Sequence, residues 1–463
     1  MANQTNSDND DCLNIYILTY NCARTLINPA TFAPYLFHAL PPNSDAPELL
    51  VLCLQELAPI SYSFLGGSFL TPYFKAFREA VRLASKDRGG YVNVVSRNLG
   101  MTAIMVFLRD DVADNLTWIR TAGVGVGVSE MGNKGAVGVQ LGYRATRRHP
   151  PSADGEVGDE SGELEFTFVS AHLAPMEDGL ERRNEDYRNI MQKLVFRTDQ
   201  RLKAPLPRGE EGEDAPLLQG ELASQEHETL GEEETGMYSA SSYLFFAGDL
   251  NYRTSLLQPS PQDVEEKFPQ PSTNSNDPMP FRDLLAEDQL TQQVKAGKTL
   301  HGLTEAPITF PPTYKYHTDG SKAVLMVNGE DRQHWSWARH RWPSWCDRIF
   351  FSNPQGGDVK VTPQRYTSLP LFATSDHRPV ALAASVPLKA VSNAGQVEGE
   401  RGPTAPFGID PDWTSKRIQA RRKELAVGIM AYLALTWEGN GLLVTTTIGV
   451  VGAWLIIRSL LMG

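Results

Sequence analysis

The sequence predicts an α+β fold, a two-sheet β-sandwich flanked by helices, for most of its 463 residues. Three observations lead to this prediction. Apolar runs of strand length recur along the chain, and some are continuous enough for burial on both faces. Helical segments lie among these runs without strict strand–helix alternation. A strongly apolar segment near the C-terminus is predicted to form a separate membrane-anchor helix.

Each strand is predicted from its apolar and β-branched content. The first is Leu13–Asn21, and the second is the continuous apolar run Leu49–Glu56. Further strands are predicted at Tyr91–Ser96, Met101–Leu108, Ala136–Leu141, Leu164–Ala171, Tyr243–Gly248, Arg348–Ser352 and Val380–Ser385. Helices are predicted at Thr31–Leu40, Tyr73–Ser85 and Gly179–Leu202. No clear helix opens after the glycine-rich stretch 123–127, which therefore indicates a strand and turn, not a dinucleotide loop.

Composition divides the chain into four parts. Residues 1–12 are polar and acidic and are predicted to be a disordered N-terminus with no signal peptide. Residues 13–388 form the main domain, residues 389–409 have the composition of a linker, and residues 410–463 hold a basic helix and the membrane anchor. Acidic, low-complexity insertions near 147–163 and 205–236 are expected to be exposed and disordered.

The formal net charge of −12 argues weakly against a nucleic-acid binder. The acidity is uneven, because residues 208–236 hold ten acids against one arginine, so the net charge says little about the folded part. The four cysteines form no CxxC pair and are expected to be reduced thiols. Cys346 lies inside a motif, but a small buried apolar residue is a better interpretation than a reactive thiol.

The C-terminal segment is predicted to anchor the chain in a membrane. Asp410 and Pro411 are typical of a helix start, and a basic cluster follows at 416–423. The apolar run Leu425–Trp437 is short for a span, residues 438–441 are expected to break the helix, and Leu442–Ile457 is uncharged. Arg458 would lie near the far interface.

Basic residues before the span favour a cytosolic main domain, and a short span suits the endoplasmic reticulum. A buried C-terminal helical hairpin is the alternative.

Polar residues at the ends of predicted strands indicate the chemistry. Asp249 and Asn251 alternate on an extended segment, so their side chains are expected to point to the same side. Asp249 is suited to orient a water and Asn251 to donate to a phosphoryl oxygen, although a turn with Asx caps would use the same residues. Other acids, amides and histidines at strand ends are Asn21, Glu56, His172, Asp347, Asp376 and His377. This mixture suits metal-assisted attack of water on a phosphate ester.

Two complete motifs carry a resemblance to a known family: FAGDLNYR at 246–253 and WPSWCDRI at 342–349. The chain resembles the inositol polyphosphate 5-phosphatases, within the superfamily of magnesium-dependent endonucleases, exonucleases and phosphatases, and in particular a tail-anchored fungal type. Supporting motifs are TYN at 19–21, QE at 55–56, MGNKGAV at 131–137, SAHL at 170–173, PTYKY at 312–316 and SDHRP at 375–379. The resemblance implies the four-layer fold of that superfamily over residues 13–388.

The resemblance also implies a role for each matching residue. The implied catalytic residues are Asp249, Asn251, His377, Asp347, His172 and Asn21, with Asp347 orienting His377. The implied Mg²⁺ ligands are Glu56, Asn21 and Asp376. The implied substrate-binding residues are Asn133, Lys134, Tyr314, Lys315, Arg339, Arg341 and Arg348. Arg339 stands where the family usually has lysine, which keeps the charge but changes its geometry.

The predicted function is Mg²⁺-dependent removal of the 5-phosphate of phosphatidylinositol 4,5-bisphosphate, or of other 5-phosphorylated inositides, at a membrane surface. The expected partners are this lipid and the membrane, with no nucleic acid. Two alternatives are a nuclease of the same superfamily, which would not share the Lys315, Arg339 and Arg341 set, and a non-catalytic phosphoinositide-binding membrane protein, which would lack a catalytic residue.

Overall fold

The computed structural model describes residues 12–145, 162–197, 234–239, 241–272, 279–318, 334–354, 360–388 and 405–462, and the backbone alone of 218–221 and 324–325. The predicted disordered stretches at 1–11 and 147–161, most of the one at 205–236, and residues 389–404 of the predicted linker lie outside these residues.

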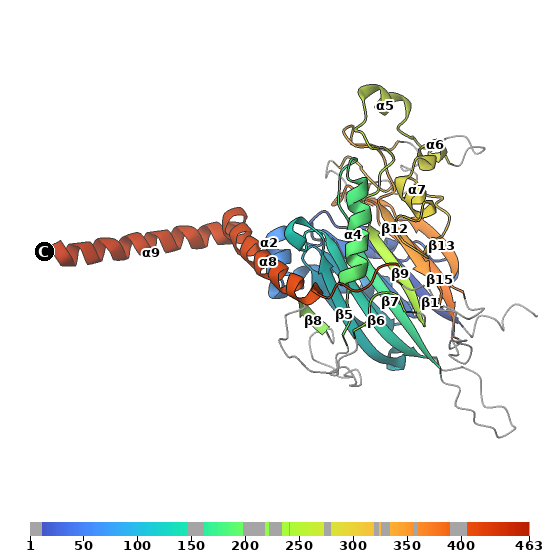
Figure 1. Ribbon diagram of the computed structural model, residues 1–463, viewed down its shortest axis with the longest axis horizontal. Coiled ribbons are helices and arrows are strands. Elements are labelled where there is room, and N and C mark those ends of the chain that lie inside the picture. Colours follow the sequence, from blue (N-terminus) through green and yellow to red (C-terminus); the bar gives the residue numbers. More distant parts are fainter. Residues whose placement is uncertain are drawn as a thin grey trace, which may run out of the picture.

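Two mixed sheets form the sandwich, and Figure 1 shows them packed together. The first has seven strands in the order β13-β15-β1-β2-β4-β3-β8, and the second has six in the order β10-β12-β9-β7-β6-β5. Strands of the first sheet are β1 (Cys12–Asn21), β2 (Leu49–Gln55), β3 (Tyr91–Leu99), β4 (Thr102–Arg109), β8 (Leu218–Glu221), β13 (Thr362–Ser368) and β15 (Val380–Pro387). Strands of the second are β5 (Leu116–Gly125), β6 (Gly135–Arg144), β7 (Glu163–His172), β9 (Ser242–Asp249), β10 (Thr304–Glu305) and β12 (Asp347–Ser352), and a separate pair is formed by β11 (Val324–Leu325) and β14 (Leu371–Phe372).

Residues 15–18 of strand β1 show why apolar residues follow one another along the buried strands. Ile15 and Ile17 point into the core between the two sheets, whereas Tyr16 and Leu18 point to the outer face of the first sheet. Because side chains alternate along a strand, burial on both faces requires apolar residues at every position. Burial of each such aliphatic side chain contributes about 1.5–3 kcal/mol.

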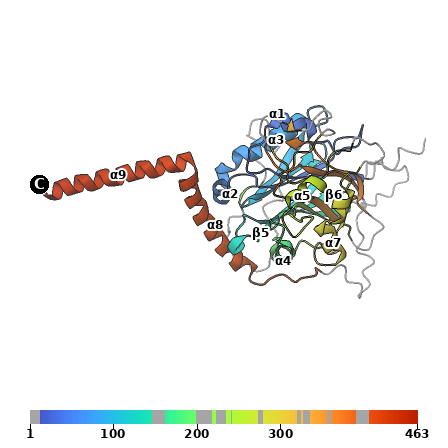
Figure 2. The same ribbon diagram turned by 90° about the horizontal axis from the view of Figure 1, so that it is seen from above.

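Helices cover the outer faces of the sandwich (Figure 2). On the first sheet lie α1 (Pro29–Phe32), a 3₁₀ turn (Ala33–Tyr35) and α3 (Thr71–Ala84). On the second lie α4 (Leu180–Lys193) and α7 (Gln289–Lys295). The remaining helices before the C-terminal segment are α2 (Ile60–Leu65), α5 (Pro261–Glu266) and α6 (Arg282–Ala286), with further 3₁₀ turns at Gly67–Phe69, Ala113–Asn115 and Val128–Glu130. The two-sheet sandwich predicted from the sequence is confirmed.

Local predictions differ from the structure in two helices and in several strands. The predicted helix Thr31–Leu40 is only α1 followed by the 3₁₀ turn, because Pro34 has no N–H to continue the α-helical pattern. The predicted helix Gly179–Leu202 ends at Lys193, after which Phe196 forms a β-bridge. Strands β5, β8, β10, β11, β13 and β14 were not predicted, and β8 lies within the insertion near 205–236 that was expected to be disordered. The glycine-rich end of β5 is a strand, as expected.

The C-terminal segment consists of two long helices, α8 (Trp413–Leu435) and α9 (Trp437–Met462). The predicted break at 438–441 is wrong: these residues continue α9, and the chain turns instead at Thr436, whose backbone is extended. α9 has 26 residues and a mean hydropathy of 1.8, is not buried against the rest of the chain, and projects from the sandwich in Figure 1. It is long and apolar enough to cross a membrane, which does not favour the buried hairpin.

The preceding helix behaves differently, because α8 packs against α2 at the side of the sandwich. Several cations of the predicted basic cluster are used in this packing. Arg417 pairs with Glu424, and Arg421 donates to the carbonyl of Phe64, whereas Arg422 and Lys423 remain exposed.

We predict that the two helices contribute differently to stability. Removing residues 437–463 should leave the thermal unfolding midpoint of the detergent-solubilised protein unchanged, because α9 buries no surface against the domain. Removing residues 410–463 should lower the midpoint, because it also removes the packing of α8. Differential scanning calorimetry of the two truncated chains checks this, and equal midpoints would contradict it.

Candidate active site

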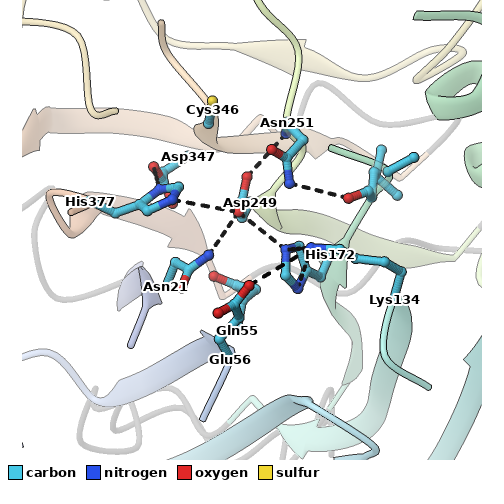
Figure 3. A network of polar contacts seen from close by, with 12 residues as sticks. Asn21, Gln55, Glu56, Lys134, His172, Asp249, Asn251, Cys346, Asp347 and His377 are labelled. Atoms are coloured by element: carbon cyan, nitrogen blue, oxygen red, sulfur yellow. Dashed lines mark hydrogen bonds and ion pairs between the residues drawn. The ribbon is translucent and has the colours of Figure 1, made fainter. Parts of the chain in front are cut away.

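The register of the second sheet brings three polar side chains to one end of the sandwich. Asp249, the last residue of β9, pairs with His172 of the parallel strand β7 and with Asp347 of the antiparallel strand β12. Asn21, the last residue of β1, approaches from the first sheet. Figure 3 shows these residues converging on Asp249. The predicted gathering of strand-end residues therefore occurs.

Asp249 is the centre of this network and is almost completely buried. Its Oδ2 accepts a hydrogen bond from Asn21 Nδ2 at 2.8 Å and lies 3.2 Å from His172 Nε2. Burial opposes ionisation of this carboxyl group, but His377, His172 and Lys134 outweigh burial and hold its pKa well below the usual range. Asp249 is therefore an anion at neutral pH and a weak base.

His377 and Asp347 form a buried ion pair beside Asp249. His377 Nδ1 lies 2.9 Å from Asp347 Oδ2, and its Nε2 lies 3.9 Å from Asp249 Oδ2. Thr313 Oγ1 donates to the same Asp347 oxygen at 2.7 Å. Burial raises the pKa of Asp347 to about 6, whereas for His377 the effect of burial is outweighed by Asp347 and Asp249, which raise its pKa to about 9. Both groups are therefore charged at pH 7.

Asn251 does not lie on an extended segment as predicted. Its φ is +58°, in the left-handed region, and its backbone N–H donates to Asp249 Oδ1 at 3.1 Å. The turn with an Asx cap, which the sequence also allowed, is therefore present. The Asn251 side chain donates from Nδ2 to the carbonyl of Leu173 and accepts from Arg253. Since an amide nitrogen carries two hydrogens, one donor remains for a ligand.

Glu56 and Lys134 lie next to His172 at the same end of the sandwich (Figure 3). Lys134 Nζ contacts His172 Nε2 and lies 4.0 Å from Glu56 Oε1, while Arg24 Nε lies 3.1 Å from Glu56 Oε2. Burial lowers the pKa of both Lys134 and His172. Glu56 has a φ of +47°, a strained conformation that is typical of functional sites.

Other residues with predicted substrate roles lie around this network. The ring of Tyr314 is 4.6 Å from that of His377. Lys315 pairs with Asp376 at 2.7 Å, and Arg341 pairs with Glu177 at 2.8 Å. Arg339 is largely exposed and lies 3.9 Å from the exposed Glu265. Asn133 is adjacent to Lys134 in the loop before β6, and its buried Oδ1 has no hydrogen-bond partner.

The structure contradicts the predicted substrate role of Arg348. Its side chain is fully buried, with Asp288 at 2.9 Å and Glu305 at 2.5 Å from its guanidinium nitrogens. Adjacent residues of a strand face opposite sides, so when Asp347 faces His377, Arg348 must face away from the site. Its role is structural.

Several residues of the network were not predicted as functional. Thr313 holds Asp347, Arg253 holds Asn251, and Ser375 donates to the Asn21 carbonyl while accepting from the His377 N–H. Each lies inside one of the quoted motifs, so the sequence contained the signal. Arg24, which pairs with Glu56, lies outside the quoted motifs, so the sequence contained no signal for its role.

The donor atoms of the site fit a divalent cation. Glu56 offers a partly exposed carboxylate, and Asn21 offers an amide oxygen, which is the donor chemistry that Mg²⁺ prefers. Asp249, Asp347 and His377 also bring one possible ligand atom each within 4.8 Å of one another. In that group, however, the imidazole already pairs with Asp347. The predicted ligands Asp376 and Glu56 each have a cationic partner, Lys315 and Arg24 respectively. Of the two, Glu56 is the acid that lies beside Lys134 and His172.

Two mixed sheets packed face to face, with acids, amides and histidines at one end, define the architecture of the endonuclease, exonuclease and phosphatase proteins. The chain belongs to this class: the model of Endonuclease/Exonuclease/phosphatase family 2 matches residues 18–383. The superfamily expected from the two motifs is thereby confirmed.

Among the proteins of this class, the chain is similar in sequence to several inositol phosphate 5-phosphatases. The chain is 27% identical over 366 residues to the type II inositol 1,4,5-trisphosphate 5-phosphatase of Mus musculus, covering 78% of this chain and 28% of that protein. It is 28% identical over 295 residues to inositol-1,4,5-trisphosphate 5-phosphatase 1 of Schizosaccharomyces pombe, covering 63% of this chain and 19% of that protein. The matched part thus spans only about a quarter of the length of such relatives.

The fold also matches a solved structure. The inositol polyphosphate 5-phosphatase domain of a synaptojanin, crystallised with inositol (1,4)-bisphosphate and a calcium ion, superposes with a TM-score of 0.53 and 23% sequence identity. The match covers 81% of this chain and 84% of that domain. It confirms the fold.

We predict that Arg348→Met destabilises the protein by about 3–5 kcal/mol, because it leaves the buried Asp288 and Glu305 without their counter-charge. Arg339→Met, at a largely exposed position, serves as the control and should change stability little. Urea unfolding of the two variants checks this. If Arg348→Met unfolds at the wild-type midpoint, the structural assignment is wrong.

Proposed function

We propose that the chain is a metal-dependent phosphoinositide 5-phosphatase. The observation that carries the proposal is the buried Asp249, held ionised between His172, His377 and Asn21. The family membership and the names of the relatives support the same reaction class.

In the proposed mechanism, Asp249 orients a water in line with the bond between phosphorus and the inositol oxygen. Because the pKa of Asp249 is low, this carboxylate is suited to accept a hydrogen bond from the water and not to remove its proton completely. In a loose transition state the water does not have to lose its proton before the bond to phosphorus forms. As the new P–O bond forms and the bond to inositol breaks, the attacking water gives up one proton and the departing inositol oxygen takes up one through solvent, so that the products are an inositol hydroxyl and inorganic phosphate. Protonated His377, held by Asp347, and the free N–H of Asn251 donate to the phosphoryl oxygens.

A Mg²⁺ ion bound by Glu56 and Asn21 would supply positive charge to the phosphoryl and leaving oxygens. The neighbouring Lys134 and His172 add donors at the same edge of the site. Lys315, Arg341 and Tyr314 would contact a neighbouring phosphate on the inositol ring, because ammonium and guanidinium groups suit such oxyanions. Asn133 and Lys134 would contact the phosphate that joins inositol to lipid.

The proposed substrate is phosphatidylinositol 4,5-bisphosphate in a membrane, as for a tail-anchored enzyme. α9 supports this, because an anchored site meets lipid at high effective concentration. Its uncharged stretch, residues 439–457, is about 28 Å long at 1.5 Å per residue. That length suits the thin bilayer of the endoplasmic reticulum, at about 27 Å. The exposed Arg422 and Lys423 before α9 favour a cytosolic catalytic domain.

We predict that Asp249→Asn lowers phosphate release by about 10²-fold or more, because the amide misorients the water and removes the charge that His377 and His172 face. The measurement is phosphate release from inositol lipids, soluble inositol phosphates and abasic DNA. Wild type should act on substrates with a 5-phosphate and leave the DNA intact.

Asp283→Asn, at an exposed position on α6, is the matched control and should keep full activity. Equal release by wild type and Asp249→Asn would sink the mechanism. Cleavage of the DNA without activity on inositides would instead favour the nuclease.

We predict that chelation with EDTA abolishes hydrolysis and that added Mg²⁺ restores it. Glu56→Gln should raise the Mg²⁺ concentration for half-maximal activity by about 10-fold or more, because an amide oxygen replaces a carboxylate. Glu265→Gln, at an exposed acid, should leave this concentration unchanged. Full activity in EDTA would refute the metal requirement.

A further inference from the structure

Helix α8 is joined to the domain by specific contacts, although it lies outside the residues that match the family model. A Cβ atom added at Gly428 would lie 3.0 Å from Phe64 Cβ, so the two helices approach closely at a residue without a side chain. The ring of Tyr432 packs edge-on against Phe69 at 5.4 Å. Arg421 Nη1 donates to the carbonyl of Phe64 at 2.6 Å. These contacts fix the position of α8 along α2.

Glu424, in the middle of α8, is a completely buried carboxylate. Arg417 compensates its charge with two hydrogen bonds of 2.8 and 3.1 Å, and Arg421 lies 3.7 Å away. Its Oε1 also accepts a hydrogen bond of 2.8 Å from the backbone N–H of Gly132. A carboxylate needed only to hold α8 could have remained at the surface, where it would not incur the cost of desolvation.

Gly132 belongs to the loop between β5 and β6 that carries Asn133 and Lys134. On its other side, the Gly132 carbonyl accepts from Met101 N at 2.9 Å, and the Met101 carbonyl accepts from Leu57 N at 3.2 Å. Leu57 directly follows Glu56. A Cβ atom at Gly100 would lie 2.2 Å from the Gly132 oxygen, so the two backbones pack too closely for any side chain at position 100.

The same loop has a second support, from helix α4. Lys193 Nζ pairs with Glu130 Oε1 at 2.6 Å. The loop is therefore held from α4 at Glu130 and from α8 at Gly132, and Asn133 and Lys134 directly follow the second point. Loss of either support would allow Lys134 to move relative to His172 and Glu56.

We infer that Glu424 is a positioning residue of the active site. Through the Gly132 amide it fixes the loop that presents Asn133 and Lys134, and through Met101 it steadies the backbone beside Glu56. The helix that leads to the membrane segment is thus part of the catalytic unit. This inference rests on the proposed function for its effect on rate, but its effect on the loop is independent of that function.

The test uses the full chain in detergent and a soluble inositol phosphate, so that delivery to a membrane plays no part. The double variant Arg417→Met, Glu424→Met removes the buried ion pair as a whole, a change that buried pairs often tolerate without loss of stability. We expect it to lower kcat/KM by about 10- to 100-fold, and to speed hydrogen exchange in peptides covering residues 126–134. Glu424→Gln, which keeps an acceptor for the Gly132 N–H but leaves Arg417 without its counter-charge, should retain more of the wild-type kcat/KM and slower exchange at 126–134 than the double variant. Lys423→Ala, an exposed neighbour, is the control.

Wild-type kcat/KM together with wild-type exchange at 126–134 in the double variant would overturn the inference. So would a rise in exchange spread evenly over the domain, which would mean general destabilisation. If wild type itself fails to hydrolyse inositol phosphates, the proposed function fails, and the exchange data alone decide the role of Glu424.

Discussion

A single buried carboxylate joins the two sheets of the sandwich at the end where the candidate site lies. Asp249 belongs to the second sheet and Asn21 belongs to the first, so the hydrogen bond between their side chains links the two sheets directly. An anion in this position is tolerable only if cations and donors surround it. His172 and His377 meet this requirement. The charge of Asp249 therefore stabilises the register between β7, which carries His172, and β9, and it also stabilises the turn before β15, which carries His377. Gln55 and Ser170 add a second link between the sheets.

Charge is used differently on the two sides of β12. Asp347 faces the site and holds His377, while the adjacent Arg348 turns into the interior and joins Asp288 to Glu305. Asp288 also caps the start of α7, so this interior pair fixes a helix against the second sheet. One short motif therefore orients the imidazole of His377 and, through Arg348, holds the Asp288 cap of α7 on the opposite side of the strand. The two residues can have these different contacts because successive side chains of a strand point to opposite faces of the sheet.

The sequence predicted those parts of the structure that follow from local periodicity. Continuous apolar runs indicated buried strands, and polar residues at strand ends indicated where the site lies. It failed where a tertiary contact decides the outcome. Arg348 was predicted to bind substrate, but in the structure its side chain faces away from the site. Its position next to Asp347 already indicated this, because adjacent residues of a strand face opposite sides. The docking of α8 rests on Gly428 and on a buried Glu424, and neither residue breaks a helical pattern or marks an interface in the sequence. The turn at Thr436 was misplaced because glycines at 439 and 441 suggested a break that the helix does not have.

The turn at Thr436 determines where the C-terminal helix could be replaced by that of another protein. The sequence composition suggests a joint near residues 389–409, but a graft made there would replace α8 together with α9. The close approach at Gly428 would then face a foreign helix whose side chains do not fit. A chimaera joined after Thr436 keeps the native surface of the domain intact and changes only the apolar helix beyond it. The unit that can be exchanged without disturbing the domain therefore begins at residue 437, well beyond the compositional boundary.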